Sequence, residues 1–356
     1  MEAVREQFPD VSFTGVGLSR MSGQGLERVH DEASPDGSMW LHNVLKLRYF
    51  RRLLQRCRSY LQSTPPDLVV LVDYGGFNMY LAHAASQAGV PVLYYIPPQV
   101  WAHGGHRAKK LRKWVDRLAV IYPFEEEFYR SRGVAADYVG HPLFDELEEN
   151  PSRDKKVQEL RNEDRCKIVG LFPGSREQEV RRHLPVALDA CVRIADRWPG
   201  VRFPVVCPEG VEDLAHELTA DREALRIEFP DASPAEVASA SSMCLTKSGT
   251  VTLELASQEC PMIIFYRVSA FSYFIASGLR TSDHIGLVNS LAGRTVCRER
   301  LMWRKNSRWL AEQALELGSD PERYEGCKQS LHELMEDFAQ PGASSNAADI
   351  VADMIS

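Results

Sequence analysis

The chain has 356 residues, of which 44% are hydrophobic and 26% are charged, and its formal net charge is -7. This length exceeds the usual ceiling for one hydrophobic core, so we expect two domains. The composition is that of a globular chain without extensive disorder, and the acidic balance argues against general nucleic-acid binding.

The eight cysteines are scattered and form no CxxC pair and no metal-like cluster with histidine. We interpret them as reduced, mostly buried thiols of a cytoplasmic protein, and we expect no metal site. No apolar run approaches the ~18 residues that span a bilayer, and the first ten residues (MEAVREQFPD) contain no apolar signal segment. The sequence therefore predicts neither a membrane-spanning helix nor secretion.

Short apolar runs between turn signals predict an α/β domain in the first part of the chain. The chain opens with helical character, and residues 11–16 (VSFTGV) predict a short strand, as if an earlier strand and its loop were absent. The run LVVLV at residues 68–72 is continuous, which predicts a strand buried on both faces. Further strands are expected at residues 90–96, 117–121 and 137–139.

Two polar side chains stand at the ends of these predicted strands. Asp73 directly follows the strand at residues 68–72, at the edge where open α/β sheets usually bind ligands. His141 lies between a glycine and a proline, and such a turn should leave it exposed at a strand end. Both residues are candidates for a functional site.

Residues 41–61 combine apolar side chains at helical spacing with five arginines, which predicts a basic amphipathic helix. Such a helix either packs on its own domain and leaves its arginine face in solvent, or contacts a phospholipid surface. The sequence alone leaves both alternatives open.

A second strand-helix series follows a highly charged stretch at residues 146–164, which suits a linker. Its five predicted strands cover residues 168–172, 201–207, 225–229, 243–247 and 261–266. We therefore predict two doubly wound α/β domains that face a cleft, the first one incomplete. Their expected limits are residues 1–150 and 151–340, and residues 341–356 should form a helix that returns toward the first domain.

The stretch LFPGSREQEV at residues 171–180 ends a strand in a sharp turn before a helix. Gly174 lets the backbone approach a ligand, Ser175 is a candidate helix cap, and Arg176 places a guanidinium where phosphate would bind. An ordinary strand-to-helix turn with a surface arginine fits the same residues.

A similar turn, Ser248-Gly249-Thr250, follows the strand at residues 243–247 and opens a helix whose free amides can hold phosphate. Glu254 lies on the first turn of that helix. Its carboxylate could accept bonds from the hydroxyls of a ribose, or it could simply compensate the helix dipole.

At this point six ordered blocks resemble one family. They read YYIPPQVWA, YPFEEEFY, YVGHPLFDEL, LFPGSREQEV, KSGTVTLELA with CPMIIFYRV, and NSLAGR. Together they resemble the lipid-A-disaccharide synthases, which are GT-B-fold glycosyltransferases, over residues 11–354. The resemblance implies an inverting transfer of diacylglucosamine from UDP-2,3-diacylglucosamine to 2,3-diacylglucosamine 1-phosphate, with release of UDP and without a metal or other cofactor.

The resemblance also assigns residues to the two substrates. Asp73 matches the aspartate proposed as the general base in this family, and His141 becomes a donor-site contact or a second candidate base. The residues implied to bind the UDP-sugar, from its diphosphate to its ribose and uridine, are Gly174, Ser175, Arg176, Ser248, Gly249, Thr250, Glu254, Asn289 and the further acid Glu299.

The departures from the family pattern fall in the acceptor-side half. The family opens with a strand and a glycine-rich loop, and this chain starts beyond them. Gly76 stands where the family has a second aspartate, and Pro97 and His103 replace a serine and a tryptophan. The acceptor-side motif that contains MG in the family is reduced to GSMWLHNVL at residues 37–45.

Three hypotheses follow for the activity. The first is an active lipid-A-disaccharide synthase whose true start lies further upstream. The second is a related UDP-sugar glycosyltransferase with a different acceptor. The third is a non-catalytic relative that binds UDP-sugar or lipid.

The acylated substrates imply peripheral attachment to the inner face of the cytoplasmic membrane. The predicted contacts are the basic helix at residues 41–61 and the apolar run FSYFI at residues 271–275. Some members of the family form dimers by exchanging C-terminal segments, so a homodimer is a further possibility.

Overall fold

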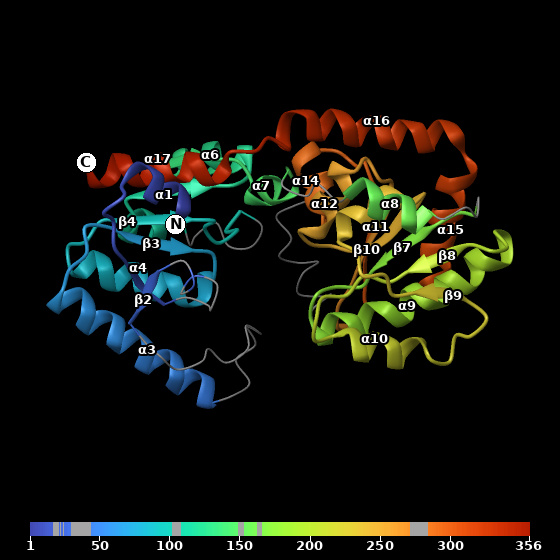
Figure 1. The fold of residues 1–356 in the computed structure, drawn as a ribbon, viewed down its shortest axis with the longest axis horizontal. Coiled ribbons are helices and arrows are strands. Elements are labelled where there is room, and N and C mark those ends of the chain that lie inside the picture. Colours follow the sequence, from blue (N-terminus) through green and yellow to red (C-terminus); the bar gives the residue numbers. More distant parts are fainter. Residues whose placement is uncertain are drawn as a thin grey trace. The chain divides into compact units, whose positions relative to one another are not determined.

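The computed structural model describes residues 1–16, 21, 23, 25–29, 44–101, 108–148, 153–161, 166–270 and 284–356. The chain divides into two compact units. Unit 1 comprises Met1–Asp145 and Gln340–Ser356, and unit 2 comprises Glu146–Ala339. The chain therefore passes from one unit to the other twice, and its last helix belongs to the same unit as its first (Figure 1).

Unit 1 is built on a parallel four-stranded sheet in the order β3-β4-β5-β6, and β1 and β2 form a separate parallel pair. The strands are β1 (Phe13–Gly15), β2 (Leu26–Arg28), β3 (Val69–Val72), β4 (Val92–Tyr95), β5 (Arg117–Val120) and β6 (Ala136–Tyr138). The helices are α1 (Glu2–Gln7), α3 (Val44–Ser63), α4 (Gly75–Gln87), α5 (Ala108–Trp114), α6 (Pro123–Arg130), α7 (Pro142–Glu148), which crosses into unit 2, and α17 (Ala343–Ile355).

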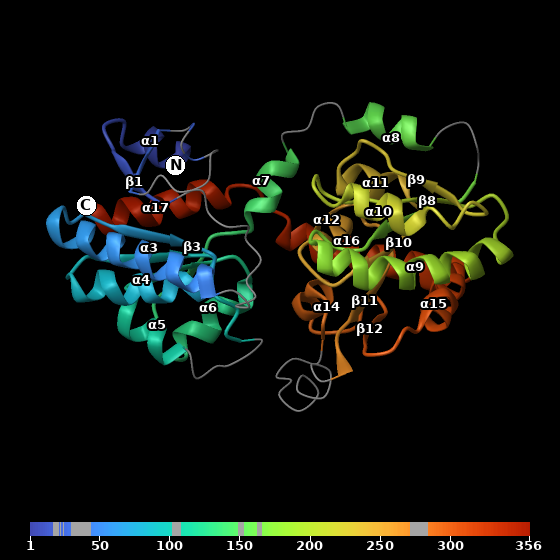
Figure 2. The ribbon, with the colours of Figure 1, turned by 90° about the horizontal axis from the view of Figure 1, so that it is seen from below.

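Helices cover the two faces of this sheet (Figures 1 and 2). Leu71, Tyr94 and Leu118 pack on one face with side chains of α3, α4 and α5. On the other face, Leu93 and Ala119 pack against α17. The two clusters form the core of unit 1.

Strand β3 differs from its prediction. Leu71 is buried, but Val70 and Val72 are 43% and 46% exposed. The expectation of a strand buried on both faces is therefore wrong, because β3 lies at an edge of the sheet and the α17 cluster lies over β4 and β5. A continuous apolar run cannot distinguish an edge strand from a central one.

The predicted basic helix is present as α3. Leu53, Cys57 and Leu61 are buried, whereas Arg51 and Arg52 are exposed. The helix thus packs its apolar positions within unit 1 and keeps arginines in solvent. Within the described ranges, no helix is both long and apolar enough to cross a membrane.

Helix α17 is fixed to unit 1 by polar contacts as well as by burial of Ile350. The carboxylate of Asp145 accepts hydrogen bonds from three backbone amides at its first turn, at 2.7 to 3.1 Å. Asn346 donates to the carbonyl of Val139 at 3.0 Å. Negative charge at a helix N-terminus is favourable, so Asp145 stabilises this attachment.

Unit 2 contains the parallel sheet β12-β11-β10-β7, and β8-β9 continue it through isolated bridges between β7 and β8. The strands are β7 (Val169–Phe172), β8 (Arg202–Pro204), β9 (Arg226–Glu228), β10 (Met243–Lys247), β11 (Met262–Arg267) and β12 (Glu299–Met302). The helices are α8 (Arg153–Arg161), α9 (Glu177–Arg197), α10 (Glu212–Thr219), α11 (Pro234–Ala240), α12 (Val251–Ser257), α14 (Leu287–Ala292), α15 (Ser307–Ser319) and α16 (Pro321–Phe338).

All five predicted strands of unit 2 are present, and β12 is one that the sequence did not predict. This strand, ERLM, has only four residues, two of them charged, and lies at the sheet edge beside β11. The charged stretch expected to be a linker contains α8, which packs on α11, with Arg161 donating to the carbonyl of Ser239 at 2.6 Å. A high density of charged residues therefore does not distinguish a linker from an exposed helix.

Candidate functional site

The predicted phosphate turns of unit 2 follow two neighbouring strands. β7 and β10 are parallel, and Phe172 is paired with Thr246 near their carboxyl ends. The turn at residues 173–176 and the turn at residues 247–250 therefore leave the same edge of the sheet side by side. This edge is where ligands bind in open α/β sheets.

Glu179 on the first turn of α9 connects these two turns. Its Oε2 accepts a hydrogen bond from the backbone amide of Ser175 at 3.1 Å. Its Oε1 lies 3.2 Å from Nζ of Lys247 and 3.6 Å from Nη1 of Arg176. The side chains of Lys247 and Glu179 are only 15% and 13% exposed, whereas that of Arg176 is 66% exposed.

Lys247 and Glu179 are not among the site residues that the sequence predicts. Lys247 ends the strand that lies next to the strand before the PGSR turn, and this placement could have identified it as a site residue. The placement is known only when β7 and β10 are known to be neighbours. The two cations and the Ser175 amide converge on one carboxylate, which is the arrangement that an anion requires.

Gly174 has a φ of 125°, and a Cβ built on it would lie 2.6 Å from both Cβ and Oε2 of Glu179. Only glycine combines this backbone conformation with so close an approach. The expectation that Ser175 caps the helix is wrong, because α9 begins at Glu177 with Arg176 at the N-cap and without a side-chain cap bond. Glu179 engages the Ser175 amide in place of a cap.

A second polar network joins Ser248 to Glu299. The hydroxyl of Ser248 donates to the carbonyl of Ile285 at 2.5 Å. The backbone amides of Ile285 and Gly286 donate to the two carboxylate oxygens of Glu299 at 3.0 and 2.8 Å. Nδ1 of His284 lies 3.3 Å from the same carboxylate. The structure thus brings two predicted residues together around the segment that leads into α14.

Asn289 is completely buried, and its side chain binds backbone. Its Oδ1 accepts from the amides of Val296 and Cys297 at 2.8 and 2.9 Å, and its Nδ2 donates to the carbonyl of Cys297 at 2.7 Å. The amide therefore fixes the connection between α14 and β12, just before Glu299. Its contact with uridine stays a prediction.

The remaining predicted donor residues lie at the start of α12. The carbonyl of Gly249 accepts from the hydroxyl of Thr252 at 2.7 Å, and Thr250 is exposed at the N-cap position. Burial and, to a smaller extent, the charge of Glu146 together raise the pKa of Glu254 to about 7. A carboxyl that is partly protonated near neutral pH can both donate and accept hydrogen bonds.

In unit 1, Asp73 and Tyr74 adopt left-handed backbone conformations with φ of 47° and 45°. Such conformations are costly for residues other than glycine, and they occur preferentially at functional sites. The hydroxyl of Tyr94 donates to the carbonyl of Asp73 at 2.8 Å, and Nδ2 of Asn78 donates to the same carbonyl at 2.8 Å and to that of Val72 at 3.0 Å. These bonds hold the strained turn while the Asp73 side chain stays exposed.

The turn sequence predicts an exposed His141, but this prediction is wrong. His141 is buried, with 5% of its surface accessible. The rings of Tyr122 and Phe144 pack on it at centroid distances of 5.7 and 5.8 Å. Its Nδ1 accepts a hydrogen bond from the backbone amide of Leu143 at 3.2 Å. Burial lowers the pKa of His141 to about 4, so the ring is neutral at pH 7.

A buried acid near His141 was missed. Glu125 is 1% exposed and accepts hydrogen bonds from Nε1 of Trp101 at 2.8 Å and from the amide of Tyr122 at 3.2 Å. Burial raises its pKa to about 7, against the opposing effect of these bonds. Its contact with Trp101 anchors the end of the PPQVW stretch to α6. No group of three or more potential metal ligands occurs in the described ranges of either unit.

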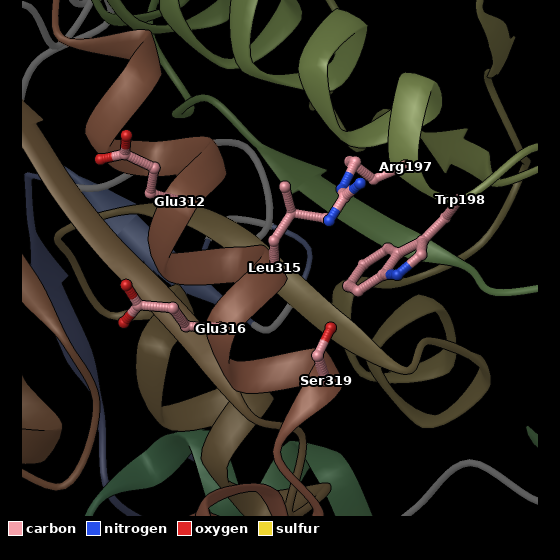
Figure 3. A pocket seen from close by; sticks show the side chains of 6 residues that line it. All are labelled: Arg197, Trp198, Glu312, Leu315, Glu316 and Ser319. Atoms are coloured by element: carbon pink, nitrogen blue, oxygen red, sulfur yellow. The ribbon is translucent and has the colours of Figure 1, made fainter.

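A hollow in unit 2 does not coincide with these residues. It measures about 470 Å³ and is lined by Arg197, Trp198, Glu312, Leu315, Glu316 and Ser319 (Figure 3). It lies at the carboxyl end of α9, whereas the PGSR turn lies at the amino end of that helix. A second hollow of about 440 Å³ lies along α3 in unit 1. Neither hollow is lined by a predicted site residue, so the candidate site is argued from side-chain geometry.

Comparison with known proteins gives a consistent result. Residues 1–354 match the sequence model of a family described as lipid-A-disaccharide synthetase. The lipid-A-disaccharide synthase of Geobacter metallireducens is 35% identical over 98% of this chain and 90% of that protein. The protein of the same name from Trichlorobacter lovleyi is 36% identical over 100% of this chain and 93% of its own length.

Solved structures are similar in fold at low sequence identity. MurG of Acinetobacter baumannii superposes with a TM-score of 0.56 at 15% identity, covering 99% of this chain and 94% of that one. A putative UDP-N-acetylglucosamine 2-epimerase of Listeria monocytogenes gives a TM-score of 0.57 at 12% identity, covering 99% and 92%. The predicted GT-B-like α/β architecture is thereby confirmed.

Proposed function

The chain belongs to the lipid-A-disaccharide synthetase family and is a glycosyltransferase of lipid A disaccharide synthesis, and we propose which substrates and residues carry its reaction. It transfers diacylglucosamine from UDP-2,3-diacylglucosamine to 2,3-diacylglucosamine 1-phosphate, with inversion at the anomeric carbon. The convergence of Arg176, Lys247 and the Ser175 amide at the ends of β7 and β10 is the observation that carries this proposal.

Unit 2 supplies the donor site. Arg176 and Lys247 bind the diphosphate and meet the negative charge that develops when the bond between the anomeric carbon and UDP breaks. The turn at residues 248–250 adds backbone amides, and Glu254, on the first turn of the helix that follows, accepts the ribose hydroxyls. Glu299 acts by holding the backbone of Ile285 and Gly286, and Ser248 is held in turn through its hydrogen bond to Ile285.

Unit 1 supplies the base. The hydroxyl oxygen of the acceptor attacks the anomeric carbon, its proton passes to the Asp73 carboxylate, and UDP departs with the electron pair of the broken bond. The strained turn held by Tyr94 and Asn78 supports this role, because it orients one exposed carboxylate at a strand end. His141 is neutral and enclosed, so it is the weaker candidate for the base.

A related transferase with a different acceptor is the second candidate. It is favoured by Gly76 and Pro97, which depart from the family pattern in unit 1. Incubation with UDP-2,3-diacylglucosamine and a panel of sugar acceptors tests both. Turnover with 2,3-diacylglucosamine 1-phosphate supports the proposal, whereas turnover only with another acceptor supports the second candidate, and no turnover with any acceptor contradicts both.

Both substrates carry acyl chains, and we propose that the protein meets them at the inner face of the cytoplasmic membrane through α3. The exposed Arg51 and Arg52 on this helix are the supporting observation. The apolar residues 271–275, the other contact predicted from the sequence, lie outside the described residues.

Reversal of both charges, Arg51→Glu with Arg52→Glu, should lower the fraction that floats with anionic liposomes by roughly tenfold or more, since each basic residue contributes about 1 kcal/mol at such a surface. The matched control is Arg193→Glu with Arg197→Glu, a pair of exposed arginines on α9 that changes the net charge equally. Equal flotation of the two variants would contradict a contact through α3.

A further inference from the structure

A carboxylate of the protein itself contacts the same groups that the proposed function assigns to the donor's diphosphate. Glu179 accepts from the Ser175 amide at 3.1 Å and lies 3.2 Å from the Lys247 ammonium. It also lies 3.6 Å from the Arg176 guanidinium. An oxygen of a bound phosphate would take the same three partners at similar distances.

We propose that Glu179 is a displaceable internal anion, which neutralises Arg176 and Lys247 in the free protein and gives them up to the diphosphate of the donor. The inference rests on the proposed function and deepens it by adding a residue that sets the affinity of the donor site. A diphosphate carries more negative charge and more acceptor oxygens than one carboxylate, so it can replace Glu179 at both cations.

The surroundings of Glu179 allow this exchange with little rearrangement. Its backbone is held in the first turn of α9, where its amide donates to the carbonyl of Arg176 at 2.8 Å. Its carbonyl accepts from Nδ1 of His183 at 2.8 Å, and Nε2 of the same ring accepts from the amide of Arg267 at 3.0 Å. Because the backbone is fixed from both sides, only the side-chain torsions of Glu179 need to change.

Without an anion between them, Lys247 and Arg176 would destabilise the folded protein. Lys247 is mostly buried, and two cations brought together without a counter-charge repel each other. Glu179 therefore keeps the empty donor site folded, and its return to the cations when UDP leaves favours product release. The same residue lowers the affinity for the donor and for UDP, because each must compete with it.

The test is the affinity for UDP, measured by calorimetry at low salt, of the wild type and of the Glu179→Gln variant. Glutamine keeps the size of the side chain and can still accept from the Ser175 amide, but it lacks the charge that holds the two cations. We expect UDP to bind roughly fivefold tighter to the variant, as the loss of one competing ion pair predicts. Unchanged or weaker binding of UDP would overturn the inference.

Two controls separate competition from a general change of charge. Glu177→Gln removes the same charge from the same helical turn, where Glu177 pairs with Arg181 at 2.9 Å, and it should leave the affinity for UDP nearly unchanged. Uridine, which lacks phosphate, should bind the wild type and Glu179→Gln equally. An equal gain in affinity for Glu177→Gln or for uridine would contradict displacement at the diphosphate.

A double-mutant cycle with Lys247→Met gives a second, independent measurement. The gain in UDP affinity from Glu179→Gln should shrink when Lys247 is already replaced, because the cation for which Glu179 competes is then absent. An undiminished gain would overturn the inference. A wild type that binds no UDP would overturn the proposed function, whereas a wild type that binds UDP no more weakly than Glu179→Gln overturns the inference alone.

Discussion

The Asp73→Asn variant is expected to lose transfer activity by about three orders of magnitude while its affinity for UDP stays unchanged, since general-base catalysis typically contributes 10²–10⁴-fold. Asparagine has nearly the same shape as aspartate but cannot take the proton of the acceptor hydroxyl. It also tolerates the left-handed backbone that residue 73 adopts, with φ of 47°, so the turn should stay folded. Initial rates of UDP release and calorimetry with UDP measure the two effects.

Removal of the Tyr94 hydroxyl provides a graded comparison. Tyr94→Phe deletes the hydrogen bond to the carbonyl of Asp73. It should lower kcat by roughly tenfold with little change in KM, because the backbone of Asp73 is then held less firmly while its carboxylate remains. Tyr324→Phe is the matched control, since its hydroxyl donates to the carbonyl of Ser242 at 2.7 Å in unit 2.

If Asp73→Asn keeps more than about a tenth of the wild-type rate, Asp73 is not the general base.

The Gly174→Ala variant is expected to lose affinity for UDP by at least about tenfold and to destabilise the protein by about 2 kcal/mol or more. The new methyl group would lie 2.6 Å from Glu179, and the backbone has a φ of 125° that alanine adopts poorly. The turn must therefore move, and the Ser175 amide and Arg176 move with it. Calorimetry with UDP and unfolding in urea measure these changes.

Gly210 offers a control with the same backbone problem and no clash. Its φ is 90°, and a Cβ there would meet nothing within 4 Å. Gly210→Ala should therefore cost about 1 kcal/mol of stability and leave UDP affinity unchanged. Normal UDP affinity in Gly174→Ala would show that the PGSR turn does not hold the diphosphate.

Strands β7 and β10 of unit 2 and the turns that follow them could be predicted because their signals are local. The apolar runs of β7 and β10 are short and end in glycine-containing turns, so both strand ends were found from the sequence. The pairing of Lys247 with Glu179 could not be found in this way. It depends on β7 and β10 being neighbours, which is a property of the sheet order and not of either segment.

The misjudged positions have the same physical cause. His141 is covered in part by Tyr122, which follows a different strand, and the exposure of Val70 and Val72 comes from the edge position of β3. The contact of Asn289 with the uridine end of the donor is implied by the family resemblance and stays a prediction. The sequence could not show that the buried side-chain amide of Asn289 also satisfies backbone groups between α14 and β12.

The attachment of α17 to unit 1 sets the order in which the chain can fold during synthesis. The N-terminal part of unit 1 leaves the ribosome first, but the face of its sheet at Leu93 and Ala119 is covered only when Ile350 has emerged. All of unit 2 is made in between, which takes roughly 10 to 40 seconds at ordinary elongation rates. Unit 2 is thus the first part able to complete its core, and unit 1 exposes an apolar sheet face to chaperones, or to other nascent chains, for that whole interval.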